Sequence, residues 1–139
     1  MIDFVSYWNA KRSGARLPAR ADIDPMDLKP FLGDLFMLDV VGAPKRFRYR
    51  LIGTRIVAAV GRDSTGKYLE DVFGAERATV ENAFYQAICL HRTPMRTSGV
   101  LDWRDREFRK YEIAYVPIAE DGMTVDIIVG CMSIDHAGG

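Results

Sequence analysis

The alternation of side chains at residues 46–51 most constrains the fold of this chain. Phe47, Tyr49 and Leu51 alternate with three arginines. A period of two is typical of a β-strand with one buried and one solvated face. The apolar run LFMLDVV at residues 35–41 precedes it, and four residues join the two. The sequence therefore predicts an antiparallel hairpin, with Phe47, Tyr49 and Leu51 on the buried side.

The rest of the chain separates into helical and extended segments. Pro25 after Asp24 suits a helix start, Thr54 suits a cap, and Gly61 suits a helix end. Helices are predicted at residues 2–12, 25–33, 55–60, 68–74 and 75–92, and further strands at 94–104, 107–118 and 123–135. This order predicts an α+β fold: a five-stranded antiparallel sheet, with helices inserted between strands 2 and 3 and an N-terminal helical extension. We expect the extension to cover residues 1–33, the sheet domain 34–136 and a tail 137–139.

The longest predicted helix, at residues 75–92, carries apolar residues that we expect to face the sheet. These are Val80, Phe84, Ala87, Ile88 and Leu90. Pro94 lies just beyond its end, where a proline cannot continue a helix.

Composition indicates one soluble domain. The chain has 139 residues, 48% of them hydrophobic and 27% charged, with no apolar run long enough to span a bilayer. Cys89 and Cys131 form no CxxC, which favours reduced thiols and a cytoplasmic protein. Residues 1–67 hold 12 Lys and Arg against 7 Asp and Glu, and residues 68–139 the reverse. A net charge of zero does not favour nucleic-acid binding.

The stretch GRDSTGK, residues 61–67, has the spacing of a phosphate-binding P-loop. A P-loop follows a buried strand, opens a helix and continues with a Ser or Thr that binds Mg²⁺. Here the preceding segment RIVAAV reads as helical, and Tyr68 stands where the hydroxyl residue belongs. The stretch is therefore interpreted as a turn between short helices.

Three stretches resemble the PAS-domain family, and in particular a subfamily of small stand-alone bacterial PAS proteins. They are YWNAKRSGARLPARADIDP at residues 7–25, LFMLDV at 35–40 and FRYRLIGTRIVAAVGRDSTGKYLEDV at 47–72. The resemblance implies a PAS fold and a sensory or interaction module without catalysis. Such modules often form homodimers, and the resemblance also implies a small cavity between the sheet and the long helix. It does not supply the ligand, so the cofactor is unknown.

The residues that carry the family motif have structural explanations. Glycines suit backbone turns, Thr54 a helix cap, and Asp63 a cap or a partner for Arg62 or Arg50. The motif residues are Arg50, Gly53, Thr54, Gly61, Arg62, Asp63 and Gly66.

A ligand pocket is predicted on the inner face of the sheet, below the long helix. Arg55, or Arg50, would lie near its mouth and bind a carboxylate or phosphate. The alternative is that the same aromatic side chains simply fill the core. The candidate pocket residues are Phe47, Tyr49, Phe84, Ile88, His91, Met95, Trp103 and Tyr115.

Cofactor chemistry has few candidate ligands. Some PAS domains hold haem through a His near the long helix, and His91 lies at the end of that helix. A lone His at a helix end also suits the helix dipole. Light-sensing PAS domains carry a reactive Cys after the second strand, where this chain has GKYLEDV. Two isolated His and two isolated Cys give no metal-ligand spacing.

The N-terminal helix carries Phe4, Tyr7 and Trp8, too much aromatic surface to leave in water. They cover the outer face of the sheet or pack on a second subunit, and we favour a dimer interface.

These observations predict a non-enzymatic PAS module that binds a small molecule or a partner protein in bacterial signalling. No membrane or nucleic-acid partner is expected. One alternative is a small α+β cavity enzyme of the isomerase or cyclase type, which a buried carboxylate with a raised pKa would favour. Another is a ligand-free assembly adaptor with a filled core.

Overall fold

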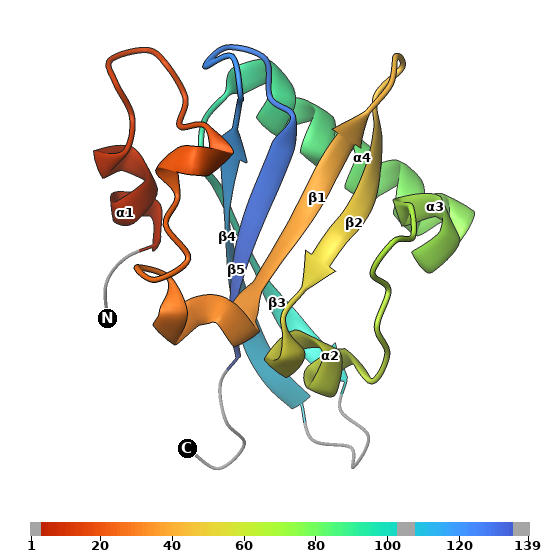
Figure 1. Cartoon of the computed structure of the whole chain (residues 1–139). Coiled ribbons are helices and arrows are strands. Elements are labelled where there is room, and N and C mark those ends of the chain that lie inside the picture. The colour runs from red at the N-terminus through yellow and green to blue at the C-terminus, as the bar shows by residue number, and fades with distance from the viewer. Residues whose placement is uncertain (1–3, 103–107, 135–139) are drawn as a thin grey trace.

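A computed structural model describes residues 4–102 and 108–134. Five antiparallel strands form one sheet in the order β2-β1-β5-β4-β3, so the first hairpin lies beside the last strand (Figure 1). This confirms the predicted α+β sheet fold. The strands are β1 (Leu35–Val41), β2 (Arg46–Ile52), β3 (Met95–Asp102), β4 (Phe108–Ile118) and β5 (Ile127–Ile134).

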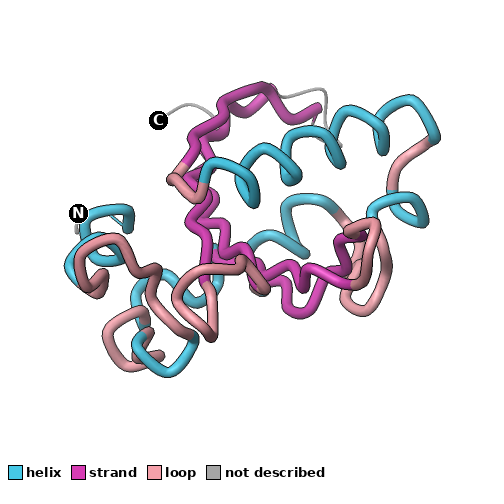
Figure 2. Tube along the Cα trace, turned by 90° about the horizontal axis from the view of Figure 1, so that it is seen from above, coloured by secondary structure: helices cyan, strands magenta, loops and turns pink. Residues whose placement is uncertain are grey.

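Helices flank both faces of the sheet. Helix α4 lies along one face together with α2 and α3, and the N-terminal segment with α1 lies at the other (Figures 1 and 2). None of the helices in the described part of the chain has the length and apolar character needed to cross a bilayer. The α-helices are α1 (Phe4–Ala10), α2 (Thr54–Val60), α3 (Leu69–Val72) and α4 (Ala75–His91), and the 3-10 helices are η1 (Arg20–Asp22) and η2 (Lys29–Asp34).

The predicted hairpin of β1 and β2 is present, but its alternation is interrupted. Met37 pairs with Leu51 and Leu38 pairs with Tyr49, so Arg50 is an extra residue without a partner on β1. Such a bulge reverses which face the following side chains take. Leu51 is therefore 44% exposed, and the prediction that it faces the core is wrong.

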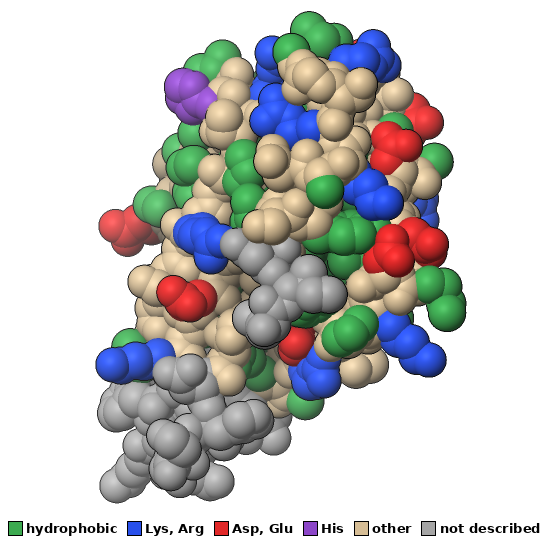
Figure 3. Space-filling model, turned by 90° about the vertical axis from the view of Figure 1, so that its left-hand side faces the viewer, with side chains coloured by type: hydrophobic (Ala, Val, Ile, Leu, Met, Phe, Trp, Pro, Cys, Tyr) green, Lys and Arg blue, Asp and Glu red, His purple; other side chains and the backbone are tan. Residues whose placement is uncertain are grey.

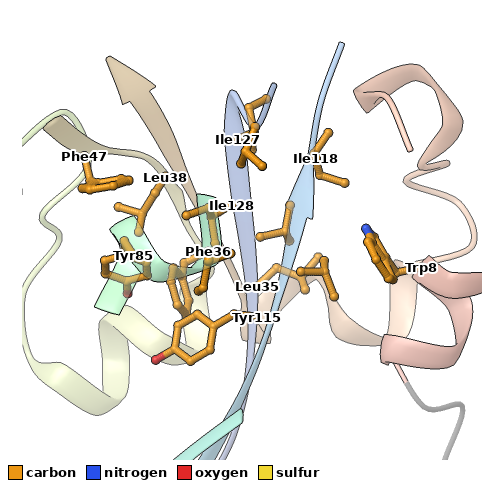
Figure 4. Close-up of a cluster of buried hydrophobic side chains, with 14 of the residues drawn as sticks. Trp8, Leu35, Phe36, Leu38, Phe47, Tyr85, Tyr115, Ile118, Ile127 and Ile128 are labelled. Carbon is orange, nitrogen blue, oxygen red and sulfur yellow. The ribbon is translucent and has the colours of Figure 1, made fainter. Parts of the chain in front are cut away.

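The core has two layers, one on each face of the sheet. On the inner face, Phe36, Leu38 and Phe47 pack with Tyr85 of α4 and Tyr115 of β4 (Figure 4). The outer face is covered by side chains from the N-terminal segment, and Figure 4 shows Trp8 across the strands from Tyr85. These outer-layer side chains are Phe4, Trp8, Leu17, Leu28 and Phe31.

Trp8 is held within its own chain. Its side chain is 1% exposed, and its indole Nε1 donates a hydrogen bond of 2.8 Å to the Pro117 carbonyl of β4. Phe4 is also buried, while Tyr7 donates to Asp27 at 2.9 Å and accepts from the Asp24 amide. Phe4 and Trp8 therefore cover the outer face of the sheet in their own chain, which was the alternative to a dimer interface, while Tyr7 stays partly buried.

The predicted face of helix α4 is right at Phe84 and Ile88 and wrong at Leu90. Ala78, Tyr85, Ile88 and Cys89 are buried, whereas Val80 and Leu90 are 62% and 77% exposed. Apolar residues surround the helix on several sides, so spacing alone could not select the face that meets the sheet.

Two predicted helix starts also differ. Gly53, rather than Thr54, is the N-cap of α2, and no side-chain cap is present there. Residues 25–28 form turns, and a 3-10 helix begins only at Lys29. The Asp24 carboxylate accepts a hydrogen bond from the Met26 amide, which stabilises a turn and not an α-helix.

Gly53 lies where two backbone segments meet. A β-carbon on it would come within 2.7 Å of the Leu32 carbonyl oxygen and closer still to Gly33. Backbone atoms cannot move aside as the end of a flexible side chain can. Glycine is therefore required at position 53 by close approach, not by an unusual φ angle, because φ is −64°.

We expect Gly53→Ala to lower the free energy of unfolding by about 2 kcal/mol or more, because overpacking forces the backbone to shift. Urea unfolding followed by tryptophan fluorescence measures this. Gly74→Ala is the matched control: φ is −63° and nothing lies within 4 Å of an added β-carbon. Equal stabilities of the two variants would contradict the close-approach explanation.

Candidate functional site

A cavity of about 430 Å³ lies between the inner face of the sheet and helices α2, α3 and α4. Its volume falls within the range of about 300–1,000 Å³ that small-molecule sites occupy. The sheet supplies one wall, with Phe36, Tyr49, Ile52, Thr97, Tyr111, Ile113, Tyr115 and Met132. The helices and loops supply the other, with Ile56, Val60, Arg62, Ser64, Val72, Phe73, Arg77, Val80, Glu81, Phe84 and Tyr85.

Aromatic rings form the floor of the cavity. The ring of Tyr115 meets those of Phe84, Tyr85 and Phe36 at centroid distances of 4.8, 5.7 and 5.9 Å, each edge to face. Gly130 makes this possible, because a β-carbon there would collide with the Phe36 ring. The floor is therefore a rigid aromatic surface fixed by mutual ring contacts.

The hydroxyl groups in this floor stay protonated over the neutral range. Burial raises the pKa of Tyr115 to about 12, although its hydrogen bond with Thr97, 3.2 Å long, opposes the rise. Burial also raises the pKa of Tyr49 and of Tyr85, and in both cases the nearby Glu81 charge adds to the rise. The site thus offers neutral hydroxyls that can donate hydrogen bonds.

Among the residues that the structure describes, three charged side chains line the cavity: Arg62, Arg77 and Glu81. Arg77 and Glu81 are one turn apart on α4 and form an ion pair of 2.9 Å between Nε and Oε1. The guanidinium of Arg77 also lies 5.2 Å from the Phe73 ring centroid. Arg62 donates a hydrogen bond of 2.9 Å to the Val72 carbonyl, which ties the loop after α2 to the end of α3.

Three of the predicted pocket residues, Tyr49, Phe84 and Tyr115, come together in the cavity lining. Ile88 and Phe47 are fully buried in the core instead. Phe47 lies against Tyr85, with 5.5 Å between the ring centroids. Both therefore fill space between sheet and helix, as the core interpretation of these aromatics allowed.

The remaining predicted pocket residues lie elsewhere. Met95 packs against the core outside the cavity lining. His91 is exposed at the C-terminal end of α4, because only the earlier turns of that helix, Arg77 to Tyr85, cover the cavity. Trp103 lies outside the described residues.

Arg55 does not reach the cavity. Its guanidinium makes two hydrogen bonds to Asp34, at 2.8 and 3.1 Å, and a third to the Pro30 carbonyl at 3.0 Å. These contacts join α2 to η2, so the prediction of a ligand-binding role at the pocket mouth is wrong. Arg50 likewise points to the outer face, where it binds Asp39 at 3.1 Å.

The GRDSTGK loop forms one side of the cavity. Gly61 ends α2 in the left-handed region, with φ 90°. Asp63 accepts hydrogen bonds from the Thr65 amide and hydroxyl, so it stabilises its own turn and not Arg62 or Arg50. Gly66, with φ 87°, and Lys67 pair with Tyr49 at the edge of β2. The loop therefore directs Arg62 and Ser64 toward the cavity.

Sequence reasoning missed the charged part of the site. Arg62 was interpreted as a structural residue of the family motif, and no role was predicted for Arg77 or Glu81. Their i, i+4 spacing indicates an ion pair but not a cavity. Thr97, Tyr111 and Ile113 lie within the predicted strands 94–104 and 107–118, but they were not among the predicted pocket residues.

Neither cysteine lines the cavity. Cys89 is buried on α4, Cys131 lies on β5, and burial raises the pKa of both thiols. Within residues 4–102 and 108–134, no group of three His, Cys, Asp or Glu side chains is placed to bind a metal ion.

The comparisons with known proteins agree with this architecture. A family model described as a PAS domain matches residues 1–133. The chain belongs to the PAS-domain family. The match includes the N-terminal segment as well as the sheet. The comparison with curated proteins gave no match.

Solved structures with this fold include light-oxygen-voltage domains and a sensor kinase. A light-oxygen-voltage domain studied with a flavin analogue has a TM-score of 0.56 at 9% identity, over 81% of this chain and 84% of that one. The LOV protein of Rhodobacter sphaeroides has a TM-score of 0.54 at 14% identity, over 84% of this chain and 71% of that one. A sensory box sensor histidine kinase from Vibrio cholerae has a TM-score of 0.52 at 16% identity, over 79% of this chain and 90% of that one. At these identities the likeness shows the fold alone.

The charge on the surface is mixed. On the face shown in Figure 3, basic side chains are dispersed among acidic and apolar ones and do not form one basic patch. This agrees with the net charge of zero.

The Tyr115 hydroxyl should make stability depend on alkaline pH. Below pH 10 it is protonated in both folded and unfolded chains, but between about 10 and 12 only the unfolded chain loses the proton. Stability therefore falls as pH rises through this window, by about 1 kcal/mol per pH unit from this group. We expect Tyr115→Phe to show a shallower fall in urea unfolding. Parallel pH profiles for the variant and the original chain would contradict this.

Proposed function

We propose that this PAS domain is a non-enzymatic sensory module that binds a small molecule in the cavity between the sheet and α4. The observation that carries the proposal is the cavity of about 430 Å³ with an aromatic floor and a few convergent polar groups. The pathway we propose is bacterial signalling in the cytoplasm, with the signal passed on by association with a partner.

The chemistry of the lining supports binding more than catalysis. A general base in a cavity enzyme needs a carboxylate free to take a proton. Glu81, the only carboxylate among the described lining residues, is paired with Arg77 instead. The tyrosine hydroxyls have raised pKa values, so they do not supply a base at neutral pH.

The same cavity argues against a ligand-free adaptor. An adaptor with a filled core has no need of an interior space of this size, since protein interiors are close-packed. Exposed apolar side chains at Val60 and Val80, 51% and 62% exposed, also line the cavity. A bound molecule would cover this apolar surface.

A ligand in the cavity would contact two helices that can carry a signal. Val60 belongs to α2, and the residues from Arg77 to Tyr85 belong to α4. Binding that favours one arrangement of these helices shifts their population and changes the surface presented to a partner.

We expect the chain, purified from the organism that encodes it, to carry a small molecule detectable by native mass spectrometry. Ile113→Phe should reduce the occupied fraction by about tenfold or more, because a larger side chain takes space inside the cavity. The control is Val100→Phe, at a residue that is 57% exposed and outside this lining.

Loss of the ligand in both variants would indicate general unfolding, which circular dichroism detects. Retention of full occupancy in a folded Ile113→Phe protein would contradict a ligand in this cavity.

We further propose a homodimer as the unit that signals, and residues 1–33 as an N-terminal extension of a domain that covers residues 34–136. Size-exclusion chromatography with light scattering should give a mass of two chains of 15.7 kDa. Phe4 and Trp8 are buried within one chain. Dimerisation is therefore expected to persist in variants that alter α1 but still fold. A monomer at all concentrations would contradict the dimer.

A further inference from the structure

The charges around the cavity do not balance. Arg62 and Arg77 are positive and Glu81 is negative, so the described lining carries a net charge of +1. Arg77 is already paired with Glu81 at 2.9 Å. Among the described residues Arg62 forms no ion pair, and its side chain donates a hydrogen bond to the backbone carbonyl of Val72.

The guanidinium of Arg62 is held at the cavity wall. Gly61 turns the chain at the end of α2, and the hydrogen bond from Arg62 to Val72 fixes the side chain across to α3. One N–H group is used in this contact, while a guanidinium has five. The remaining donors are available for a planar anion, which arginine binds through two parallel hydrogen bonds.

The three charges also act on the cavity hydroxyls. The positive charges of Arg62 and Arg77 lower the pKa of Tyr49, and Glu81 raises it, although burial has the largest effect. The charges are therefore close enough to the buried end of the cavity to interact with a ligand there.

The interior below these charges is apolar and aromatic. Phe36, Ile52, Phe84 and Met132 line it without a charged group. A ligand that fills it needs an apolar body, and an anionic group would have to stay near Arg62. One uncompensated positive charge matches one negative charge on the ligand, whereas a cation would be repelled.

We propose that the cavity binds a monocarboxylic acid with an apolar body, whose carboxylate pairs with Arg62 and whose body lies on the aromatic floor. This inference rests on the proposed function, since it specifies the ligand of the same cavity. It gives the GRDSTGK loop a binding role through Arg62, while Asp63 and Gly66 stay structural.

The test is isothermal titration calorimetry of the full chain at neutral pH with octanoate, octanol and octylamine. These probes share an eight-carbon chain and differ in head-group charge. We expect octanoate to bind about tenfold or more tightly than octanol, and octylamine most weakly, because a hydrogen bond between charged groups is stronger than one between neutral groups.

Two variants test which residues interact with the head group of the ligand. Arg62→Gln should remove the preference for octanoate and leave octanol binding unchanged, while Glu81→Gln should strengthen octanoate binding severalfold. Arg20→Gln, on the N-terminal segment at the other face of the sheet, removes the same charge and should change nothing.

Equal affinities for octanoate and octanol would overturn the carboxylate assignment and leave the ligand cavity standing. Unchanged octanoate binding in a folded Arg62→Gln protein would also overturn the pairing of the carboxylate with Arg62. Failure of all three probes to bind would count against the carboxylic acid and against the proposed function together.

Discussion

The ring of Phe36 lies directly against Gly130, at a position where a β-carbon would collide with it. This contact joins β1 to β5 on the inner face of the sheet and leaves the ring edge toward Tyr115. Tyr115 in turn meets Phe84 and Tyr85 of α4. The absence of a side chain at Gly130 thus allows the Phe36 ring to join the aromatic floor, against which Phe84 and Tyr85 of α4 pack.

The two faces of the sheet serve different purposes. The outer face is covered by the N-terminal segment, and the hydrogen bond from Trp8 to Pro117 ties this cover to β4. The inner face keeps a cavity, which the α4 residues from Arg77 to Tyr85 cover, while Ile88 and Cys89 are buried at the later turns. The turns of α4 that line the cavity therefore lie away from the outer layer, whereas α2 is joined to η2 through Arg55. Such a separation suits a domain that must respond to a ligand and remain folded.

Much of the fold could be predicted from the sequence. The alternation in residues 46–51 and the strand-helix-strand order were enough for a five-stranded PAS sheet. The inner face was also predicted correctly at Tyr49 and Tyr115. The alternation failed at Leu51, because a bulge at Arg50 depends on how β1 pairs with β2 and has no signal in a single strand. The side of α4 that meets the sheet could not be predicted completely either, because apolar residues lie on several sides of that helix.

The site was less predictable than the fold. Arg55 was expected at the pocket and is held by Asp34 and Pro30, which lie more than twenty residues away in the sequence. Arg62 lies in the predicted turn, but its position at the cavity was not predicted. Trp8 was expected at an interface and lies under the sheet's own strands. In each case the partner comes from a distant part of the chain, and spacing within one segment says nothing about it.

The sequence by itself determined the sheet, the order of its elements and the turn at GRDSTGK, because period-two alternation and the φ preferences of glycine are local properties. Only the tertiary structure decided that Arg62 and Ser64 line a cavity, that Glu81 neutralises Arg77 there, and that Trp8 is buried in its own chain. Those outcomes depend on which segments pack together. Packing sums many weak contacts between residues far apart in sequence, which no local pattern records.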